Sequence, residues 1–389
     1  MKTFELAKKY NNWVIDKRRY FHQYPEESFK EFKTTKMIKE ELKKIGIKII
    51  GTSKTGVIGI LKGGKEGKVV ALRADIDALS VEEKTGVTYS SKIKGVMHAC
   101  GHDCHIAMLL GAAKVLFNMK DYIKGTVKFI FQPAEEIAQG AKFMIENGAL
   151  ENPKVDCIYG MHIWTYEEHG KMVIEEGSIM GSGDIWTINI KGKSCHGSEP
   201  WKGSDALSCG ASIIEKLNTI AGKMNDVRHP IVINIGTIKA GERFNIVAGE
   251  AEITGMNRTF TNYERENLPK TMEKIIKNIC EVYNCEYEFK YEFICSPMIN
   301  DSNSTKIAKD AVAKVIGIEN ITGMEKVMGS EDFSEYIKYV PGAIIHLGAY
   351  NKDKKCFYPH HSNYFNVDED VLKIGVASYA QIALDFLNK

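Results

Sequence analysis

The chain has 389 residues, of which 44% are hydrophobic and 26% charged, and its formal net charge is +2. These fractions are typical of a globular protein, and the length predicts two domains rather than one compact core. A nearly neutral chain without a long basic block has no electrostatic feature that favours nucleic acid or an anionic membrane, so we expect neither partner.

Helix-like and strand-like segments alternate through the first half of the chain, which favours an α/β fold. Helical periodicity covers residues 3–23 and 28–45, and strand-like runs follow at 57–61 and 68–74. Further along, the pattern predicts a helix over 106–118, a buried strand over 127–132, a helix over 139–147 and a short strand over 155–159.

The middle of the chain has a different order of elements. Alternating residues predict strands at 184–191, 231–239, 250–258 and 286–293, with helices at 204–217 and 263–283. The order strand-helix-strand-strand-helix-strand is that of a ferredoxin-like α+β domain. We therefore predict an inserted domain over 184–297 and a first domain made of 1–183 and 298–389, completed by a strand at 343–347 and a helix at 369–387.

Sequence features that bear on location predict a cytoplasmic protein. The N-terminal residues form an amphipathic pattern and lack the apolar stretch of a secretory signal peptide. The longest apolar runs are too short and too interrupted to span a bilayer. Nine scattered cysteines, an odd number, indicate a reduced protein rather than a disulfide framework.

Residues 97–105, MHACGHDCH, concentrate histidine and cysteine side chains. Thiolate and imidazole are typical ligands of zinc and related ions. Cys100 and His102 lie two residues apart in a loop expected to precede a helix, so both can point into one cavity. Cys104 and His105 fit the start of that helix, where they would support the ligands.

The segment FQPAEE places two adjacent carboxylates, Glu135 and Glu136, just beyond a predicted strand. The carboxyl ends of strands are where α/β sheets bind ligands. One carboxylate of such a pair can bind a metal while its neighbour serves as a general base. Taken alone, the pair is better explained as a solvated acidic loop.

Histidines follow two further strands. His162 lies in YGMHIW, and His360 and His361 lie in PHHSNYF. A lone histidine at such a place is more often a core residue than a ligand. Together with the preceding segments, however, these residues supply thiolate, imidazole and carboxylate at several strand ends, which predicts one metal site.

Arg73, Asp75 and Asp77 in ALRADIDAL occupy alternate positions and so share a face of a strand. The two aspartates fit either metal ligands or a buried ion pair with Arg73. For Asp77 we favour support of a ligand over direct ligation.

The predicted insert carries three polar residues that suit substrate binding. His196 lies in the loop KSCHGSEP between a strand and a helix, and Asn245 and Arg258 lie before and at the end of another strand. All three residues would equally well be polar side chains at the protein surface without a specific function. The guanidinium of an arginine nevertheless matches a carboxylate in a bidentate manner.

Eight stretches, spread from residue 18 to 369, resemble the amidohydrolase branch of the aminoacylase and carboxypeptidase group of co-catalytic metallopeptidases. They are RRYFHQYPEESFKE, ALRADIDAL, MHACGHDCH, FQPAEE, GMH, HGSEP, GSEDFSEY and HSNYFNVDE. This branch includes hippurate hydrolases, N-acetyldiaminopimelate deacetylases and plant auxin-conjugate hydrolases.

The resemblance implies a two-metal, exopeptidase-like α/β domain with an inserted lid and dimerisation domain. It implies hydrolysis of the amide bond of N-acyl-L-amino acids by a homodimer with two divalent ions such as Mn²⁺ or Zn²⁺. It also implies that Glu135 is the general base, that His196 reaches a neighbouring subunit's site, and that Asn245 and Arg258 bind the substrate carboxylate. The implied metal ligands are Cys100, His102, Glu136, His162 and His361.

Three other functions compete with this interpretation. A dipeptidase or aminopeptidase of the same group would use the same metal site. A cysteine-nucleophile amidase would use Cys100 or Cys195 with a histidine and should survive chelation, but it leaves most of the implied ligands without a role. A metal-storing or ligand-binding protein would not need Glu135.

Overall fold

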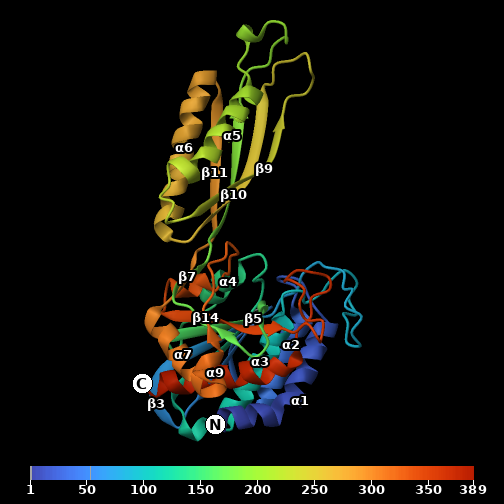
Figure 1. The fold of residues 1–389 in the computed structure, drawn as a ribbon, viewed down its shortest axis with the longest axis vertical. Helices are drawn as coiled ribbons and strands as arrows, with labels where there is room; N and C mark the ends of the chain where they lie inside the picture. Colours follow the sequence, from blue (N-terminus) through green and yellow to red (C-terminus); the bar gives the residue numbers. More distant parts are fainter. Residues whose placement is uncertain (1, 53) are drawn as a thin grey trace. The chain divides into compact units, whose positions relative to one another are not determined.

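The computed structural model describes residues 2–52 and 54–389. The chain divides into two compact units (Figure 1). The first unit comprises the residues up to Gly177 together with Ile299–Glu325 and Asp332–Lys389, and the second comprises Ser178–Met298 and Lys326–Glu331. The second unit therefore contains the whole of the predicted insert and, in addition, a short return of the chain at 326–331.

An eight-stranded sheet forms the centre of the first unit, in the order β1-β2-β4-β3-β5-β14-β6-β13. Its four central strands, β4 (Lys124–Gln132), β3 (Lys65–Asp75), β5 (Cys157–Glu168) and β14 (Gly342–Tyr350), run parallel. Parallel strands have their carboxyl ends at one edge of the sheet. The other strands are β1 (Lys48–Thr52), β2 (Val57–Lys62), β6 (Met172–Val173) and β13 (Ile321–Thr322).

Three helices of the first unit, α1 (Lys2–Gln23), α3 (His102–Phe117) and α9 (Leu372–Leu387), pack against one another, and α3 and α9 also contact β3. After a polar first turn, helix α3 is apolar on nearly all sides, and the helix is almost completely buried, as expected inside a core. No helix in the described part of the chain is long and apolar enough to cross a membrane. The remaining helices of this unit are α2 (Phe32–Ile45), α4 (Gly140–Glu146), α7 (Ser302–Ile316) and α8 (Ser334–Ile337).

Among the element boundaries that differ from the predicted ones, three bear on the candidate site residues. Helix α2 begins at Phe32 instead of residue 28, because the preceding chain turns through Phe29 with a left-handed φ of 59°. Helix α3 begins at His102, which therefore lies in its first turn rather than in a preceding loop. Strand β5 continues to Glu168 because it pairs with β14, so His162 lies within the strand rather than after it.

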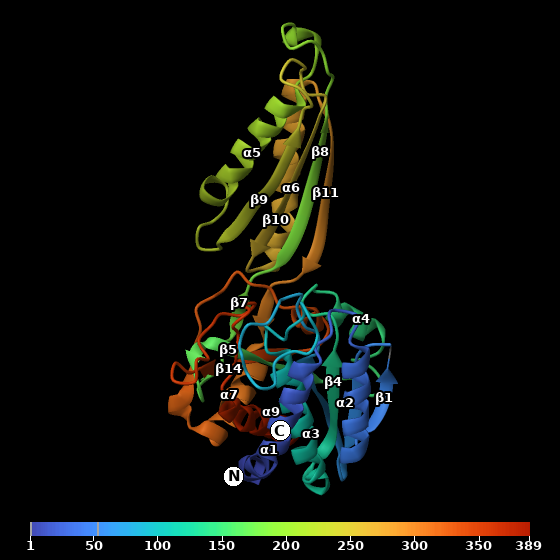
Figure 2. The same ribbon diagram turned by 90° about the vertical axis from the view of Figure 1, so that its right-hand side faces the viewer.

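The second unit has the ferredoxin-like order that the sequence predicts. Its strands form an antiparallel sheet in the order β11-β8-β10-β9. Helices α5 and α6 lie along this sheet (Figure 2). Trp186, Ile188 and Ile190 alternate along β8 and are buried in a core with residues of both helices. The elements are β8 (Gly183–Lys191), α5 (Ala206–Lys223), β9 (Ile231–Ala240), β10 (Glu250–Thr259), α6 (Asn262–Tyr283) and β11 (Glu286–Cys295). Strands β7 (Gly177–Met180) and β12 (Met298–Asn300) lie where the chain passes between the units.

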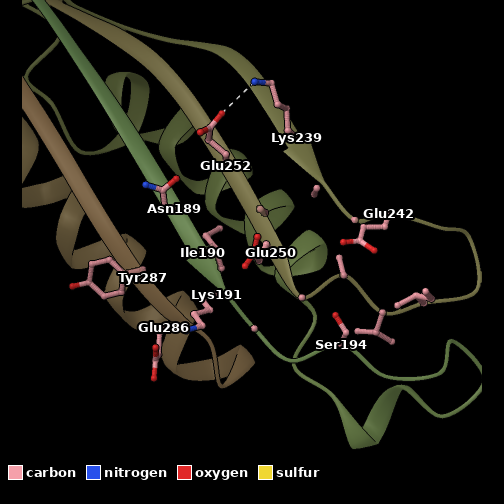
Figure 3. Close-up of a pocket in the computed structure, with 18 of the residues that line it drawn as sticks. Asn189, Ile190, Lys191, Ser194, Lys239, Glu242, Glu250, Glu252, Glu286 and Tyr287 are labelled. Atoms are coloured by element: carbon pink, nitrogen blue, oxygen red, sulfur yellow. Dashed lines mark hydrogen bonds and ion pairs between the residues drawn. The ribbon is translucent and has the colours of Figure 1, made fainter.

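The sheet of the second unit also carries a polar hollow of about 990 Å³. Its lining includes Lys191, Glu250 and Glu286, and Lys239 pairs with Glu252 at 3.4 Å across neighbouring strands (Figure 3). Because both signs of charge are mixed here, the hollow suits solvent rather than a strongly charged ligand. The candidate metal ligands lie in the first unit.

Candidate active site

The chemistry-bearing residues of the first unit gather at the carboxyl ends of its parallel strands. Arg73 of β3 pairs with Gly160 of β5, so Asp75 and His162, two residues further along each strand, lie level with one another. On the other side of β3, Asp75 pairs with Gln132, the last residue of β4. The register therefore brings the segments that follow β3 and β4 close to His162.

All five implied metal ligands lie in one connected group. The Sγ atom of Cys100 is 3.5 Å from Nε2 of His162, and Cys100 and Glu136 have potential ligand atoms within 4.8 Å of one another. Glu136 in turn has Oε1 at 3.8 Å from Nε2 of His102 and Oε2 at 3.5 Å from Nε2 of His361. Segments separated by up to 261 positions in the sequence, from 100 to 361, thus meet around Cys100 and Glu136.

The facing atoms of His102 and Glu136 fit a metal ion. His102 Nε2 and Glu136 Oε1 are buried, and neither has a hydrogen-bond partner among the described residues. Such atoms are costly to bury unless something pairs with them. The ligand atoms of Cys100, His102 and Glu136 lie within 4.8 Å of one another, and this donor set suits Zn²⁺ and related divalent ions.

Asp77 orients two members of the group. Nδ1 of His102 donates to the backbone oxygen of Asp77 at 2.9 Å and lies 3.3 Å from its Oδ1, which turns Nε2 toward Glu136. Oδ2 of Asp77 accepts the N–H of Glu136 at 3.1 Å. A carboxylate that fixes the ring of a ligating histidine is a common partner of metal ligands. These contacts agree with the supporting role that we favour for Asp77 from the sequence.

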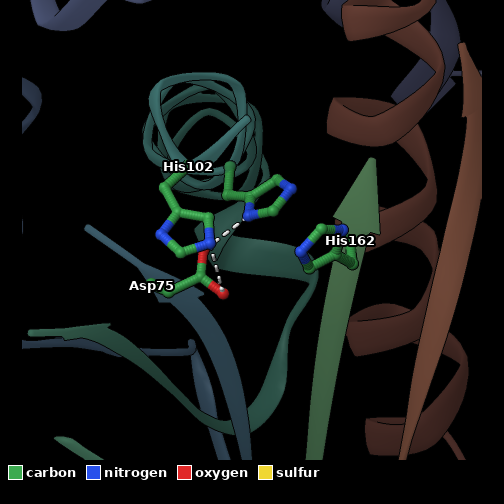
Figure 4. A group of neighbouring side chains, drawn as sticks. Asp75, His102 and His162 are labelled. Carbon is green, nitrogen blue, oxygen red and sulfur yellow. Dashed lines mark hydrogen bonds and ion pairs between the residues drawn. The ribbon is translucent and has the colours of Figure 1, made fainter. Parts of the chain in front are cut away.

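Asp75 and His105 lie beside the potential ligands, and their side-chain oxygen and nitrogen atoms already have hydrogen-bond or ion-pair partners. The ring of His105 has Nδ1 at 2.5 Å from Asp75 Oδ1, and its Nε2 accepts the N–H of Ile163 at 2.8 Å. The other oxygen of Asp75 pairs with Arg73 at 2.6 Å, which is the ion pair considered from the sequence. His162 donates from Nδ1 to the oxygen of Ile163 at 2.6 Å, leaving Nε2 toward Cys100. Figure 4 shows Asp75 with His102 and His162 beside it.

Electrostatics at the site show an excess of negative charge. Burial disfavours the charged form of His102, but the carboxylates of Asp75, Asp77 and Glu136 outweigh it and raise the pKa of His102 to about 10. Burial also raises the pKa of the Glu136 carboxyl. Shifts of this kind cluster at functional sites, and a bound dication would neutralise the charge that causes them.

Glu135 lies next to the ligands on the loop after β4. Its Oε2 is 3.9 Å from Nε2 of His102, and its side chain is 11% exposed. A carboxylate at the rim of the group, within reach of solvent, has the position that a general base requires.

The substrate-binding residues implied for the second unit lie at two separate places. The N–H of Gly197 donates to the oxygen of Asn245 at 2.8 Å, so the loops of His196 and Asn245 lie side by side. Arg258 is near the far end of β10, eight residues after Glu250. At about 3.4 Å per residue, roughly 27 Å of strand separates it from the Asn245 loop. Within one chain the structure does not bring Asn245 and Arg258 together.

Arg258 is held by neutral groups. Its NH1 donates to the backbone oxygen of Ser182 at 3.2 Å and to Oγ of Ser330 at 2.8 Å. Among the described residues, no carboxylate lies within ion-pair distance of it. An arginine positioned in this way keeps its charge for an anionic ligand.

Two residues that hold Arg73 were not identified from the sequence. Nε of Arg73 donates to Oε1 of Gln132 at 2.9 Å, and NH2 donates to Oδ1 of Asp332 at 2.9 Å. By fixing Arg73, they also fix Asp75. The sequence indicates these two partners only weakly. Gln132 is a polar residue at the end of the apolar strand VKFIFQ, and Asp332 is one of several acidic residues in GSEDFSEY.

Potential thiolate, imidazole and carboxylate ligands at the carboxyl ends of a parallel α/β sheet, with a further carboxylate beside them, are typical of a metal-dependent hydrolase. The chain belongs to peptidase family M20/M25/M40, whose model matches residues 71–385. The resemblance drawn from the sequence motifs is thereby confirmed, and the protein is an amidohydrolase or peptidase of that family.

Relatives cover from about three quarters of the chain to nearly all of it. Thermostable carboxypeptidase 1 of Saccharolobus solfataricus is 40% identical over 385 residues, or 97% of this chain and 96% of that protein. N-acyl-L-amino acid amidohydrolase of Geobacillus stearothermophilus is 40% identical over 289 residues, 74% of this chain and 78% of that one. The crystal structure of a dinuclear metal-binding peptidase of the M20 family from Bacillus subtilis matches with a TM-score of 0.87 at 34% identity, covering 98% and 99% of the two chains.

Proposed function

We propose that the protein hydrolyses the amide bond of N-acyl-L-amino acids, releasing a carboxylic acid and an amino acid, with two divalent ions such as Mn²⁺ or Zn²⁺. The observation that carries this proposal is the placement of Glu135 beside a connected group of five potential metal ligands. Arg258, which has neutral partners, suits the carboxylate of an amino acid. The proposal includes a cytoplasmic location, which the odd number of scattered cysteines favours.

The roles of the residues follow from their positions. The ions would be held by Cys100, His102, Glu136, His162 and His361. The chemistry that bound divalent ions supply at such a site is polarisation of the scissile carbonyl and acidification of water. Glu135 accepts the proton of the attacking water and passes it to the leaving nitrogen. His196 donates a hydrogen bond to the developing oxyanion, while Arg258 holds the substrate carboxylate.

The proposal includes a homodimer built through the second unit. Asn245 and Arg258 lie near opposite ends of β10, so both can bind one carboxylate only if they come from two chains. Exposed aromatic side chains also favour a partner here, since Phe244, next to Asn245 in sequence, is 97% exposed and Trp201, five residues after His196, is 74% exposed. In this arrangement His196 and Asn245 of one copy complete the site of the other.

Mixing two inactive variants tests the dimer. His196→Ala and Glu135→Ala chains, each inactive alone, should regain part of the wild-type activity when they are refolded together. The reason is that one of the two sites in a mixed dimer would combine an intact Glu135 with an intact His196. Hydrolysis is measured after the mixed dimers have been purified with two different affinity tags. Inactive mixed dimers would show that each site is built within one chain.

A substrate panel with metal removal tests the chemistry. After reconstitution with Mn²⁺ or Zn²⁺, the protein should hydrolyse N-acetyl, N-benzoyl, N-succinyl or N-indoleacetyl amino acids in preference to dipeptides with a free α-amino group. A strong chelator should abolish turnover, and added metal should restore it. Activity that survives complete metal removal would instead support a cysteine nucleophile, and a preference for dipeptides would support a peptidase.

A further inference from the structure

The segment 28–31, SFKE, contacts the metal-binding loops from the N-terminal part of the chain. It ends the stretch RRYFHQYPEESFKE, to which neither the ligand group nor the proposed reaction gives a role. Oγ of Ser28 donates to Oδ2 of Asp77 at 2.7 Å. Oε1 of Glu31 accepts the N–H of Ala134 at 2.9 Å. Both contacts end on residues next to the ligands rather than on the ligands themselves.

The loop after β4 needs such support. Ala134 has a φ of 54°, a left-handed conformation that is unfavourable for a residue other than glycine and persists only when its surroundings impose it. Glu31 binds the N–H of this residue, and Asp77 binds the N–H of Glu136. Two buried carboxylates therefore hold the backbone on either side of Glu135.

Glu31 also fixes its own segment. The same Oε1 atom accepts the N–H of Phe29 at 3.0 Å, where the chain again adopts a left-handed φ of 59°. The other oxygen, Oε2, is buried without a hydrogen-bond partner among the described residues. A buried carboxyl group that is held by neutral N–H donors is costly for stability, and an apolar residue would fill the space at lower cost. The presence of Glu31 is explained by the two residues that it holds in a left-handed conformation, Phe29 and Ala134.

We infer that Glu31 is a positioning residue, which fixes through Ala134 the backbone that carries Glu135 and Glu136. Ser28 acts in the same direction, because it fixes the carboxylate of Asp77 that orients His102. The inference rests on the proposed function, because that function makes Glu135 the general base. It adds that a residue without contact to substrate or metal sets the geometry of both carboxylates.

Glu31→Ala, Glu31→Gln and a matched control test this inference. The control is Glu26→Ala, because Glu26 belongs to the same stretch and also accepts two backbone N–H groups, of Lys33 at 3.1 Å and Thr34 at 2.8 Å. Glu26 supports the start of α2 and not the loop after β4. Loss of a supporting residue at a metal site typically costs about 10- to 100-fold in metal affinity or activity.

Glu31→Ala should therefore lower kcat and the affinity for Zn²⁺ by about 10- to 100-fold each, with a smaller change in KM. Glu31→Gln keeps an acceptor oxygen at the same place and should restore most of both losses. Glu26→Ala should lower the melting temperature while leaving kcat and Zn²⁺ affinity near wild type. If Glu31→Ala does not fold, Glu31→Asp replaces it, since the shorter side chain should produce the same losses in weaker form.

Equal effects of Glu31→Ala and Glu26→Ala on kcat and Zn²⁺ affinity would overturn the inference, and so would a Gln variant as impaired as the Ala variant. Zn²⁺ affinity is measured by competition with a chromophoric chelator and needs no substrate. If the wild-type protein hydrolyses no N-acyl amino acid, the proposed function fails, whereas the affinity comparison still decides whether Glu31 positions the loop.

Discussion

Glu135→Gln should lower kcat by ~10⁴-fold or more while leaving the metal content near that of the wild-type protein. General acid–base catalysis contributes typically about 10²- to 10⁴-fold, and Glu135 is assigned both proton transfers of the reaction, so the loss should lie at the top of that range or above it. Substrate affinity should change little, because glutamine keeps the shape of the side chain. Turnover and metal stoichiometry are measured on the same preparation.

Glu136→Ala is the matched comparison, since it changes the adjacent carboxylate in the same loop. Glu136 contacts both His102 and His361, so its loss should release metal, and added metal should restore part of the activity. If Glu135→Gln loses the metal while Glu136→Ala retains it, the two roles are reversed. Normal turnover by Glu135→Gln would exclude the proposed proton transfers.

Asp103→Ala should reduce the free energy of unfolding of the first unit by about 3–5 kcal/mol, the usual cost of removing one partner from a buried ion pair. Oδ2 of Asp103 accepts hydrogen bonds from Nε of Arg18 at 2.8 Å and Nδ1 of His22 at 2.9 Å, and all three side chains are buried. Without Asp103, the Arg18 charge loses its closest anion. Asp103 also lies in the first turn of α3, where a negative charge is favourable.

The control for this prediction removes both charges. Arg18→Met combined with Asp103→Leu should recover a large part of the lost stability, because no unpaired charge then remains in the core. Urea denaturation, followed by the fluorescence of Trp13 and Trp164 in the first unit, measures the difference. An Asp103→Ala variant as stable as the wild-type protein would mean that the pair does not stabilise the fold.

Acid should weaken this interaction. Burial opposes the charged form of Asp103, but Arg18 and His22 outweigh it and hold its pKa well below the usual range. A lowered pKa in the folded state means that this contribution is complete above the pKa of the unfolded chain, about 4. It is lost progressively as the pH falls from there toward the folded pKa.

Local sequence patterns were sufficient for the second unit and for the types of the ligands. The two-residue alternation in DIWTINIK and the helical period in 263–283 are determined locally, so the ferredoxin-like order follows from them. Helix α7 was missed even though Asp301 accepts the N–H of Ser304 at its start and its buried residues, among them Ile307, Ala311 and Val312, have helical spacing. The extent of β5 depends on its pairing with β14, which no local pattern contains.

In the candidate site, too, local patterns predict some features, whereas others depend on contacts between distant parts of the chain. MHACGHDCH and FQPAEE indicate metal chemistry through residue type alone. The contact between Glu31 and Ala134 joins positions 103 residues apart, and it is made by a glutamate that is indistinguishable from its neighbours in the sequence. Asn245 and Arg258 are separated because β10 is one continuous strand. The alternation of residues predicted this strand, whereas the resemblance assigned the two residues to one carboxylate without regard to the distance between them.

The pairing of β5 with β14 has a consequence for the order of events during synthesis. Strand β5 ends at Glu168 and β14 begins at Gly342, and the whole of the second unit is translated between them. The second unit contains its own core, so we expect it to fold on the ribosome while β5 is still an open sheet edge. Once folded, it shortens the effective chain between β5 and β14 and lowers the entropy cost of closing the sheet. His361 emerges later still, so the nascent chain acquires its complete set of metal ligands only near the end of translation.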